Sequence, residues 1–124
     1  MKSAFVFFLI LPFTAQAKLS PPCDQANKVR MELNFISSNI ANLRTTRTPQ
    51  GGPYKPFTQT TCTELVCEYE QTSKVLLKYE PNHPDANKDG YVAYPNIDLR
   101  FEKANLEDAK RRFAIALANC RRPL

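Results

Sequence analysis

The architecture follows from residues 22–43, which read PCDQANKVRMELNFISSNIANL. Apolar residues recur in this stretch at every third or fourth position, and polar residues fill the gaps. The recurring residues are Ala26, Val29, Leu33, Ile36, Ile40 and Leu43. This spacing predicts a helix with one narrow apolar seam, which suits contact with a single second helix better than a broad core.

A second helix is predicted in the last quarter of the chain. Asn96 or Asp98 can cap its start, and acidic residues come early while basic residues come late, which matches the helix dipole. We expect it to end near residue 120 and to pack antiparallel against the first helix, as a coiled-coil-like pair. Its apolar positions follow a seven-residue repeat, with small or apolar residues between them: Leu99, Leu106, Phe113 and Cys120, then Ala109, Ala116 and Leu117.

Between the helices the sequence predicts a small β-rich and loop insert. Residues 65–70 and 75–79 alternate apolar and polar side chains, which is typical of half-buried strands, and residues 71–73 are predicted as the hairpin turn between them. A short strand over residues 91–94 ends at Pro95. Irregular stretches are predicted at residues 44–56 and 80–90. The carboxylates that we expect to face solvent are Glu64, Glu68 and Glu70. The predicted fold class is therefore α+β, an antiparallel helix pair stapled by disulfides.

The first 17 residues are predicted to be a cleaved signal peptide. Lys2 gives a positive start, an apolar run extends from Ala4 to Leu11, and Ala15 and Ala17 are the small residues that signal peptidase reads. A membrane anchor or a buried strand is the alternative, but these eight residues cannot cross a hydrocarbon core that needs about 20. We therefore expect a single domain over residues 18–124, periplasmic or secreted, with no membrane insertion after cleavage.

Export into an oxidising compartment favours disulfides for the four cysteines. A metal–thiolate site is the alternative, but the spacing of Cys62 and Cys67 does not suit a zinc site and the chain has a single histidine. An antiparallel pair places Cys23, at the start of one helix, beside Cys120, at the end of the other. We predict a Cys23–Cys120 bridge, which leaves Cys62 and Cys67 as a second pair that needs a bend over residues 63–66.

The composition argues against several function classes. The chain has 124 residues and a net charge of +5 without a long basic run, so nucleic acid is not an expected partner. The basic cluster at residues 110–112 is predicted to be a solvated helix face. No Ser stands out as a partner for His83, and disulfide-bonded cysteines cannot act as nucleophiles. We expect no enzymatic activity, no catalytic residue and no cofactor.

Three stretches of the sequence resemble one family of proteins. Residues 33–42 (LNFISSNIAN) are similar to the N-terminal motif of flagellar rod and hook proteins. Residues 45–55 (TTRTPQGGPYK) and 79–96 (YEPNHPDANKDGYVAYPN) resemble the proximal-rod, or FlgC, family of the bacterial flagellar basal body. The three stretches occur in the family's order, and on this resemblance the chain is identified as a divergent, secreted member.

The resemblance implies a non-enzymatic structural or assembly protein of the flagellum, with a role in motility. It implies paired terminal helices around a β-rich middle, other flagellar rod or basal-body proteins and further copies of this chain as partners, and a location at the basal body. Asn39 and Asn42 lie near the apolar seam, where a polar residue can specify helix register; solvent exposure is the alternative. The family-motif residues are Asn39, Asn42, Thr48, Pro49, Gly51, Gly52, His83, Pro84, Asp85, Asp89, Gly90, Pro95 and Asn96.

A secreted calcium-dependent binding module is the alternative function. Asp85, Asn87 and Asp89 have the spacing of the first half of an EF-hand loop. The twelfth position is Asn96 and not the bidentate Glu that completes such a loop. A polar turn is therefore the preferred interpretation, and no metal site is predicted.

Overall fold

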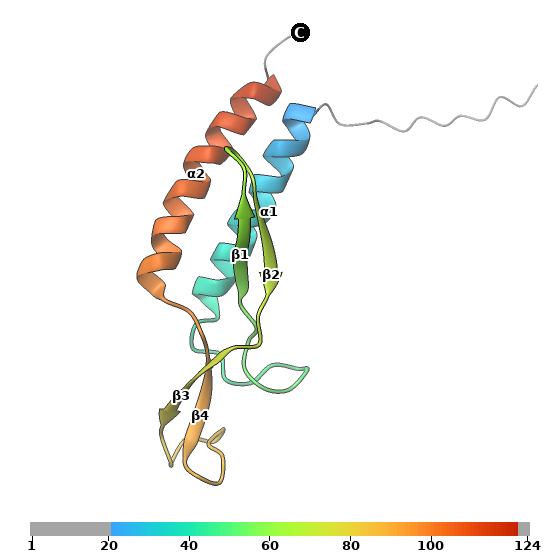
Figure 1. Cartoon of the computed structure of the whole chain (residues 1–124). Helices are drawn as coiled ribbons and strands as arrows, with labels where there is room; N and C mark the ends of the chain where they lie inside the picture. The colour runs from blue at the N-terminus through green and yellow to red at the C-terminus, as the bar shows by residue number, and fades with distance from the viewer. Residues whose placement is uncertain (1–20, 122–124) are drawn as a thin grey trace, which may run out of the picture.

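The computed structural model describes residues 21–121, in which two helices lie side by side and run in opposite directions (Figure 1). Helix α1 spans Pro21–Ala41 and helix α2 spans Leu99–Arg121. Neither of these helices is both long and apolar enough to cross a membrane. The predicted signal peptide, residues 1–17, lies outside the described residues.

Local hydrogen bonds fix the ends of the helices. Asp98 caps α2, because its Oδ1 accepts the backbone N–H groups of Arg100 at 2.9 Å and Phe101 at 3.4 Å. Helix α1 ends at Ala41 and not near residue 43. Just beyond that end, the Asn42 side chain donates to the Ser38 carbonyl at 2.9 Å, and the same carbonyl also accepts the backbone N–H of Asn42 at 3.0 Å.

The chain between the two helices forms two separate antiparallel hairpins, so the fold is α+β. Strand β1 (Phe57–Cys62) pairs with β2 (Cys67–Gln71), and β3 (Val75–Tyr79) pairs with β4 (Tyr91–Pro95). The first hairpin lies along the helix pair, whereas the second projects beyond the end of the pair where α2 begins (Figure 1).

The predicted hairpin turn at residues 71–73 is wrong. Strand β2 ends at Gln71, and the chain then passes into a different sheet. The turn of the first hairpin lies instead at residues 63–66, where the Thr63 N–H donates to the Val66 carbonyl at 2.7 Å. The actual partner of β2 is the polar strand β1 (FTQTTC), which has no apolar alternation to show that it pairs there.

Residues 75–79 form a strand, as predicted, but the prediction that this strand is half-buried is wrong. All five residues of β3 are exposed, and the buried side chains of this hairpin are Val92, Tyr94 and Pro95 of β4. The reason is the position of the hairpin, which stands clear of the helix pair (Figure 1). Glu64, Glu68 and Glu70 are exposed, as predicted.

The contact between the helices uses small residues on α2. Ala109 and Ala116 are fully buried, whereas Leu99, Leu106 and Phe113, the predicted seam, are only half-buried. The buried face of α2 is therefore rotated from the predicted seam, since alanine lets the backbones approach while larger side chains flank the contact. From α1 the buried apolar residues are Ala26, Val29 and Ile36.

The four cysteines lie in two pairs at disulfide distance. The Cα atoms of Cys23 and Cys120 are 4.6 Å apart, which places the start of α1 beside the end of α2. The Cα atoms of Cys62 and Cys67 are 4.0 Å apart, across the turn of the first hairpin. Both separations are compatible with the predicted pairing.

Gly90 allows the second hairpin to close. Its φ is +85°, and a Cβ atom there would lie 2.7 Å from the Tyr79 ring. We expect Gly90→Ala to lower the free energy of unfolding by more than the about 1–2 kcal/mol that a left-handed backbone costs an L-residue. Gly51→Ala is the matched control, because Gly51 has φ +89° with no atom within 4 Å of the added Cβ. Equal losses in chemical denaturation of the two variants would contradict the close contact with Tyr79.

Candidate functional site

A buried ion pair joins the two helices. The Glu32 carboxylate on α1 lies 2.8 Å from an Arg112 guanidinium nitrogen on α2, and the two side chains are 2% and 5% exposed. Glu32 Oε2 has no aligned hydrogen bond, so this contact is a close ion pair. Burying two charges is unfavourable unless they are paired and their remaining polar atoms are bonded.

The same two side chains hold the turn of the first hairpin. Glu32 Oε1 accepts the backbone N–H of Cys67 at 2.5 Å, and Arg112 donates to the Leu65 carbonyl at 2.9 Å. Arg112 also donates to Asp108 at 2.8 Å, one turn earlier on α2. The ion pair therefore connects three elements: α1, α2 and the β1–β2 turn.

Asn39, in the last turn of α1, binds the start of β1. Its Oδ1 accepts the Phe57 N–H at 2.9 Å, and its Nδ2 donates to the Phe57 carbonyl at 2.8 Å. It also accepts from the Tyr54 hydroxyl at 3.0 Å and donates to Glu102 of α2 at 3.4 Å. The amide thus bonds both backbone groups of one strand residue, as a neighbouring strand would.

Burial changes the acid–base behaviour of two groups near these contacts. Desolvation raises the pKa of Glu102, although its hydrogen bond from Asn39 opposes the shift. Desolvation, with the charge of Glu32 adding to it, raises the pKa of Tyr69 to about 12. The Tyr69 hydroxyl is buried and has no hydrogen-bond partner within residues 21–121. Both shifts reflect packing against the helix pair.

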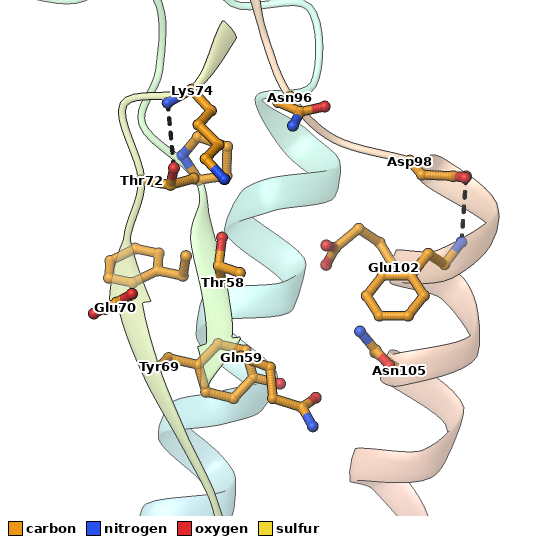
Figure 2. A pocket seen from close by; sticks show the side chains of 13 residues that line it. Thr58, Gln59, Tyr69, Glu70, Thr72, Lys74, Asn96, Asp98, Glu102 and Asn105 are labelled. Carbon is orange, nitrogen blue, oxygen red and sulfur yellow. Dashed lines mark hydrogen bonds between the residues drawn. The ribbon is translucent and has the colours of Figure 1, made fainter. Parts of the chain in front are cut away.

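A groove of about 380 Å³ lies between the first hairpin and the start of α2 (Figure 2). Its apolar lining comes from Phe57 and Tyr69 on the hairpin and Phe101 on α2. Phe101 is 60% exposed. Figure 2 shows Glu102 and Asn105 of α2 directed across the groove toward β1. An open groove with an exposed aromatic wall is suited to contact with another polypeptide.

The second hairpin carries an exposed apolar face. In its register Val75, Leu77 and Tyr79 of β3 stand on the same face as Tyr91 of β4, because residues directly opposite each other share a face. Their exposed fractions lie between 41% and 66%, and the rings of Tyr79 and Tyr91 pack edge to face at 5.4 Å. Such a face on a projecting hairpin is a candidate protein-contact surface.

Comparison with known proteins finds one kind of relative, although no protein-family model matches the chain. The flagellar basal-body rod protein FlgC of Borreliella burgdorferi is 31% identical over 112 residues, which cover 68% of this chain and 74% of that protein. FlgC of Agrobacterium fabrum is 31% identical over 82% of this chain and 81% of that protein. FlgC of Bacillus subtilis is 30% identical over 71% of this chain and 75% of that protein.

The chain belongs to the FlgC family of flagellar basal-body rod proteins.

The three FlgC-like stretches, far apart in the sequence, contact one another in the structure. Tyr54 of the second stretch donates to Asn39 and to Ser38 of the first, at 3.0 and 2.9 Å. Thr46 of the second donates to Asp85 of the third at 2.7 Å, and Arg47 forms an ion pair with the same carboxylate. The stretches that resemble FlgC therefore form one connected network, which joins the last turns of α1 to the two loops.

The remaining FlgC-like residues occupy turns and connections. Thr48 closes a turn with Gly51 and Gly52, through backbone hydrogen bonds of 2.9 Å, and Pro49 lies exposed within it. His83 Nδ1 accepts the Asp85 N–H at 2.9 Å, with the exposed Pro84 between them. Pro95 is buried at the end of β4 and Asn96 lines the groove.

The two asparagines near the seam differ in their environments. Asn39 is fully buried, so its position among the polar residues of α1 is a core position. Asn42 is half-buried and accepts the Thr45 hydroxyl at 3.1 Å, beyond the end of the helix. Asn39 is thus placed to affect packing between elements, whereas Asn42 shapes the helix end.

The Asp85 carboxylate and the Asn87 amide of the calcium-like stretch have other partners. Thr46, with Arg47 beside it, binds the Asp85 carboxylate and lowers its pKa. Asn87 Oδ1 accepts the backbone N–H groups of Asp89 and Tyr91, both at 3.0 Å. No group of three His, Cys, Asp or Glu residues suited to a metal ion occurs within residues 21–121. Nothing here supports the calcium-binding alternative.

Sequence reasoning missed the residues of the buried ion pair. Arg112 was expected on a solvated face with its neighbours, but it is 4% exposed, while Lys110 and Arg111 are exposed. The heptad spacing could have identified them as residues of the helix interface. Glu32 lies three positions after Val29 and four before Ile36. Arg112 likewise lies three positions after Ala109 and four before Ala116. Opposite charges on two facing seams indicate a pair across the interface.

Breaking the ion pair should be far more costly than breaking an exposed one. We expect Arg112→Met to lower the free energy of unfolding by about 3–5 kcal/mol, because Glu32 stays buried without its counter-charge. Arg111→Met, which removes an exposed pair with Asp108, should cost no more than about 1 kcal/mol.

A double-mutant cycle with Glu32→Met measures the coupling in urea denaturation. The double variant should be destabilised by less than the sum of the two single variants, since it leaves no unpaired buried charge. Strict additivity would show that Glu32 and Arg112 do not stabilise each other.

Proposed function

We propose that this chain is a non-enzymatic structural component of the bacterial flagellar basal body and that it contributes to motility as a rod subunit. One observation carries the proposal: the chain is about 30% identical, across most of its length, to proteins named flagellar basal-body rod protein FlgC. The network that joins the three FlgC-like stretches supports it, because it gives those residues a common structural role.

The proposed location is the periplasm, at the basal body. The signal-like residues 1–17 support export with cleavage before Lys18, after which no segment would insert into the membrane. The proposed partners are other rod or basal-body proteins and further copies of the chain, and not nucleic acid. The family-motif residues act through packing in this proposal, and none of them is catalytic.

Purified basal bodies test this function. We expect a tagged copy of the protein to remain with basal bodies through detergent extraction and to begin at Lys18 on N-terminal sequencing. Deletion of its gene should reduce swimming, and the full-length chain should restore it. Absence from basal bodies, together with normal swimming of the deletion strain, would overturn the proposal.

We also propose that both cysteine pairs are oxidised in the exported protein and that the helices form a coiled-coil-like pair locked at one end. A Cys23–Cys120 bridge would close a loop with a sequence separation of 97 and contribute about 4–5 kcal/mol, and Cys62–Cys67, with a separation of 5, about 2 kcal/mol. The first bridge would therefore be the more important for stability.

Replacing the long-range pair should destabilise the protein more than replacing the short-range pair. We expect Cys23→Ser with Cys120→Ser to lower the melting temperature by about 15 °C or more, or to abolish cooperative unfolding. Cys62→Ser with Cys67→Ser is the control and should have a clearly smaller effect. Non-reducing peptide mapping must also recover Cys23 joined to Cys120, and recovery of Cys23 joined to Cys62 or Cys67 would refute the pairing.

A further inference from the structure

Each of the two hairpins has two strand edges that face no other strand among the described residues. Strand β1 pairs only with β2, and β3 pairs only with β4. An unpaired edge presents a row of backbone donors and acceptors that another strand can bind.

Strand β3 has the composition of a strand that is covered in an assembly. Its sequence is VLLKY, with Lys78 as its one charged residue, and all five side chains are exposed. Exposed apolar edge strands with high β-propensity and little charge promote association unless a partner covers them. In this chain Pro and Gly are also absent from β3, so nothing in the strand itself blocks pairing.

Strand β1 offers an edge with a preformed groove beside it. Asn39 binds the N–H and C=O of Phe57, so these groups point away from β2 and are already occupied, and the free part of the edge begins at Gln59. Strand alternation then directs the backbone groups of Gln59 to the same side as those of Phe57. The side chain of Gln59 lines the groove, and Phe101 forms the opposite wall on α2.

The charges of the two surfaces are complementary. The groove is lined by three carboxylates, Glu70, Asp98 and Glu102, and by one lysine, Lys74. Strand β3 brings Lys78 and no carboxylate. A second copy of the chain therefore carries a strand whose charge and apolar side chains suit this groove.

The hairpin cannot reach the groove of its own chain. Three residues, 72–74, separate β2 from β3, and three more, 96–98, separate β4 from α2. These short connections hold the hairpin beyond the end of the helix pair, away from the free edge of β1 (Figure 1). The occupant must come from another molecule.

We propose that β3 of one copy pairs with the free edge of β1 of a second copy, within the groove beside α2, so that the strand order becomes β2-β1-β3-β4 across the two molecules. The proposal rests on the assembly role proposed above and names its contact. The edge of β3 and the edge of β1 are different surfaces of the same chain. The contact is therefore heterologous and repeats from one copy to the next. Backbone hydrogen bonds supply affinity, and burial of the exposed Phe101 adds to it.

Photo-crosslinking tests the contact on the mature chain, residues 18–124. We expect benzoylphenylalanine in place of Leu77 to give a covalent dimer, with the adduct on residues 57–61 or 99–105 of the second copy. The same probe in place of Asn34, an exposed polar residue of α1, should give no such adduct.

Two variants test the role of the β1 edge and of the groove beside it. Gln59→Pro removes an outward N–H from β1, and Phe101→Glu adds a charge to the groove wall. Each variant should reduce the yield of the Leu77 adduct at least tenfold. The far-ultraviolet circular dichroism spectrum should stay that of the folded chain. If Gln59→Pro fails to fold, Phe101→Glu decides. A chain that stays monomeric at millimolar concentration, or an adduct that maps elsewhere, would overturn the proposal.

Crosslinking in cells separates this inference from the proposed function. Retention in basal bodies with the Leu77 adduct formed only on a different protein would overturn the self-contact and leave the rod assignment intact. Loss from basal bodies with the mapped dimer still formed by the purified chain would overturn the rod assignment and support the contact itself.

Discussion

The arrangement of the domain depends on the buried contact between Glu32 and Arg112. The helix interface contains alanine and few large apolar side chains, so area burial alone contributes little specificity to it. The ion pair supplies a specific charge contact, and two of its hydrogen bonds, from the Cys67 N–H and to the Leu65 carbonyl, also fix the hairpin turn. Only one register between the two helices gives all these polar groups a partner. In any other register a charge would be buried without a partner.

Asn39 has a comparable role in the last turn of α1. It is a side chain that acts as part of a sheet, because it bonds both backbone groups of Phe57 and so holds β1 against the helix. Together the two polar contacts fix the first hairpin at its turn and at its open end. The second hairpin has no such attachment to the helices and is positioned by its short connections and by the contacts of Thr46 and Arg47 with Asp85.

The sequence predicted the elements better than their partners. The seam of α1, the cap at Asp98 and the strand before Pro95 follow from local spacing and local chemistry, and the structure has an element at each place. Pairing is a long-range property: alternation in residues 75–79 indicates a strand but not that this strand pairs with β4. Charged residues at seam positions were assigned to the solvent side because a charge in the core is stable only with a partner from another element. The FlgC-like stretches identified the family, whereas the Thr46–Asp85 contact that links two of them required the fold.

The antiparallel course of the helices determines how the domain can carry a load. Both ends of the described chain leave at one end of the helix pair, where Cys23 and Cys120 meet, and the free hairpin projects from the other end (Figure 1). A force applied to the hairpin against both chain ends runs along both helix axes and loads the two helices in parallel, without pulling their interface contacts apart. A force that separates the two ends acts across the axes and would open the same contacts one after another, as a zipper opens. The place where the helices meet at their ends is therefore the mechanically weak point of the domain unless a covalent bond closes it.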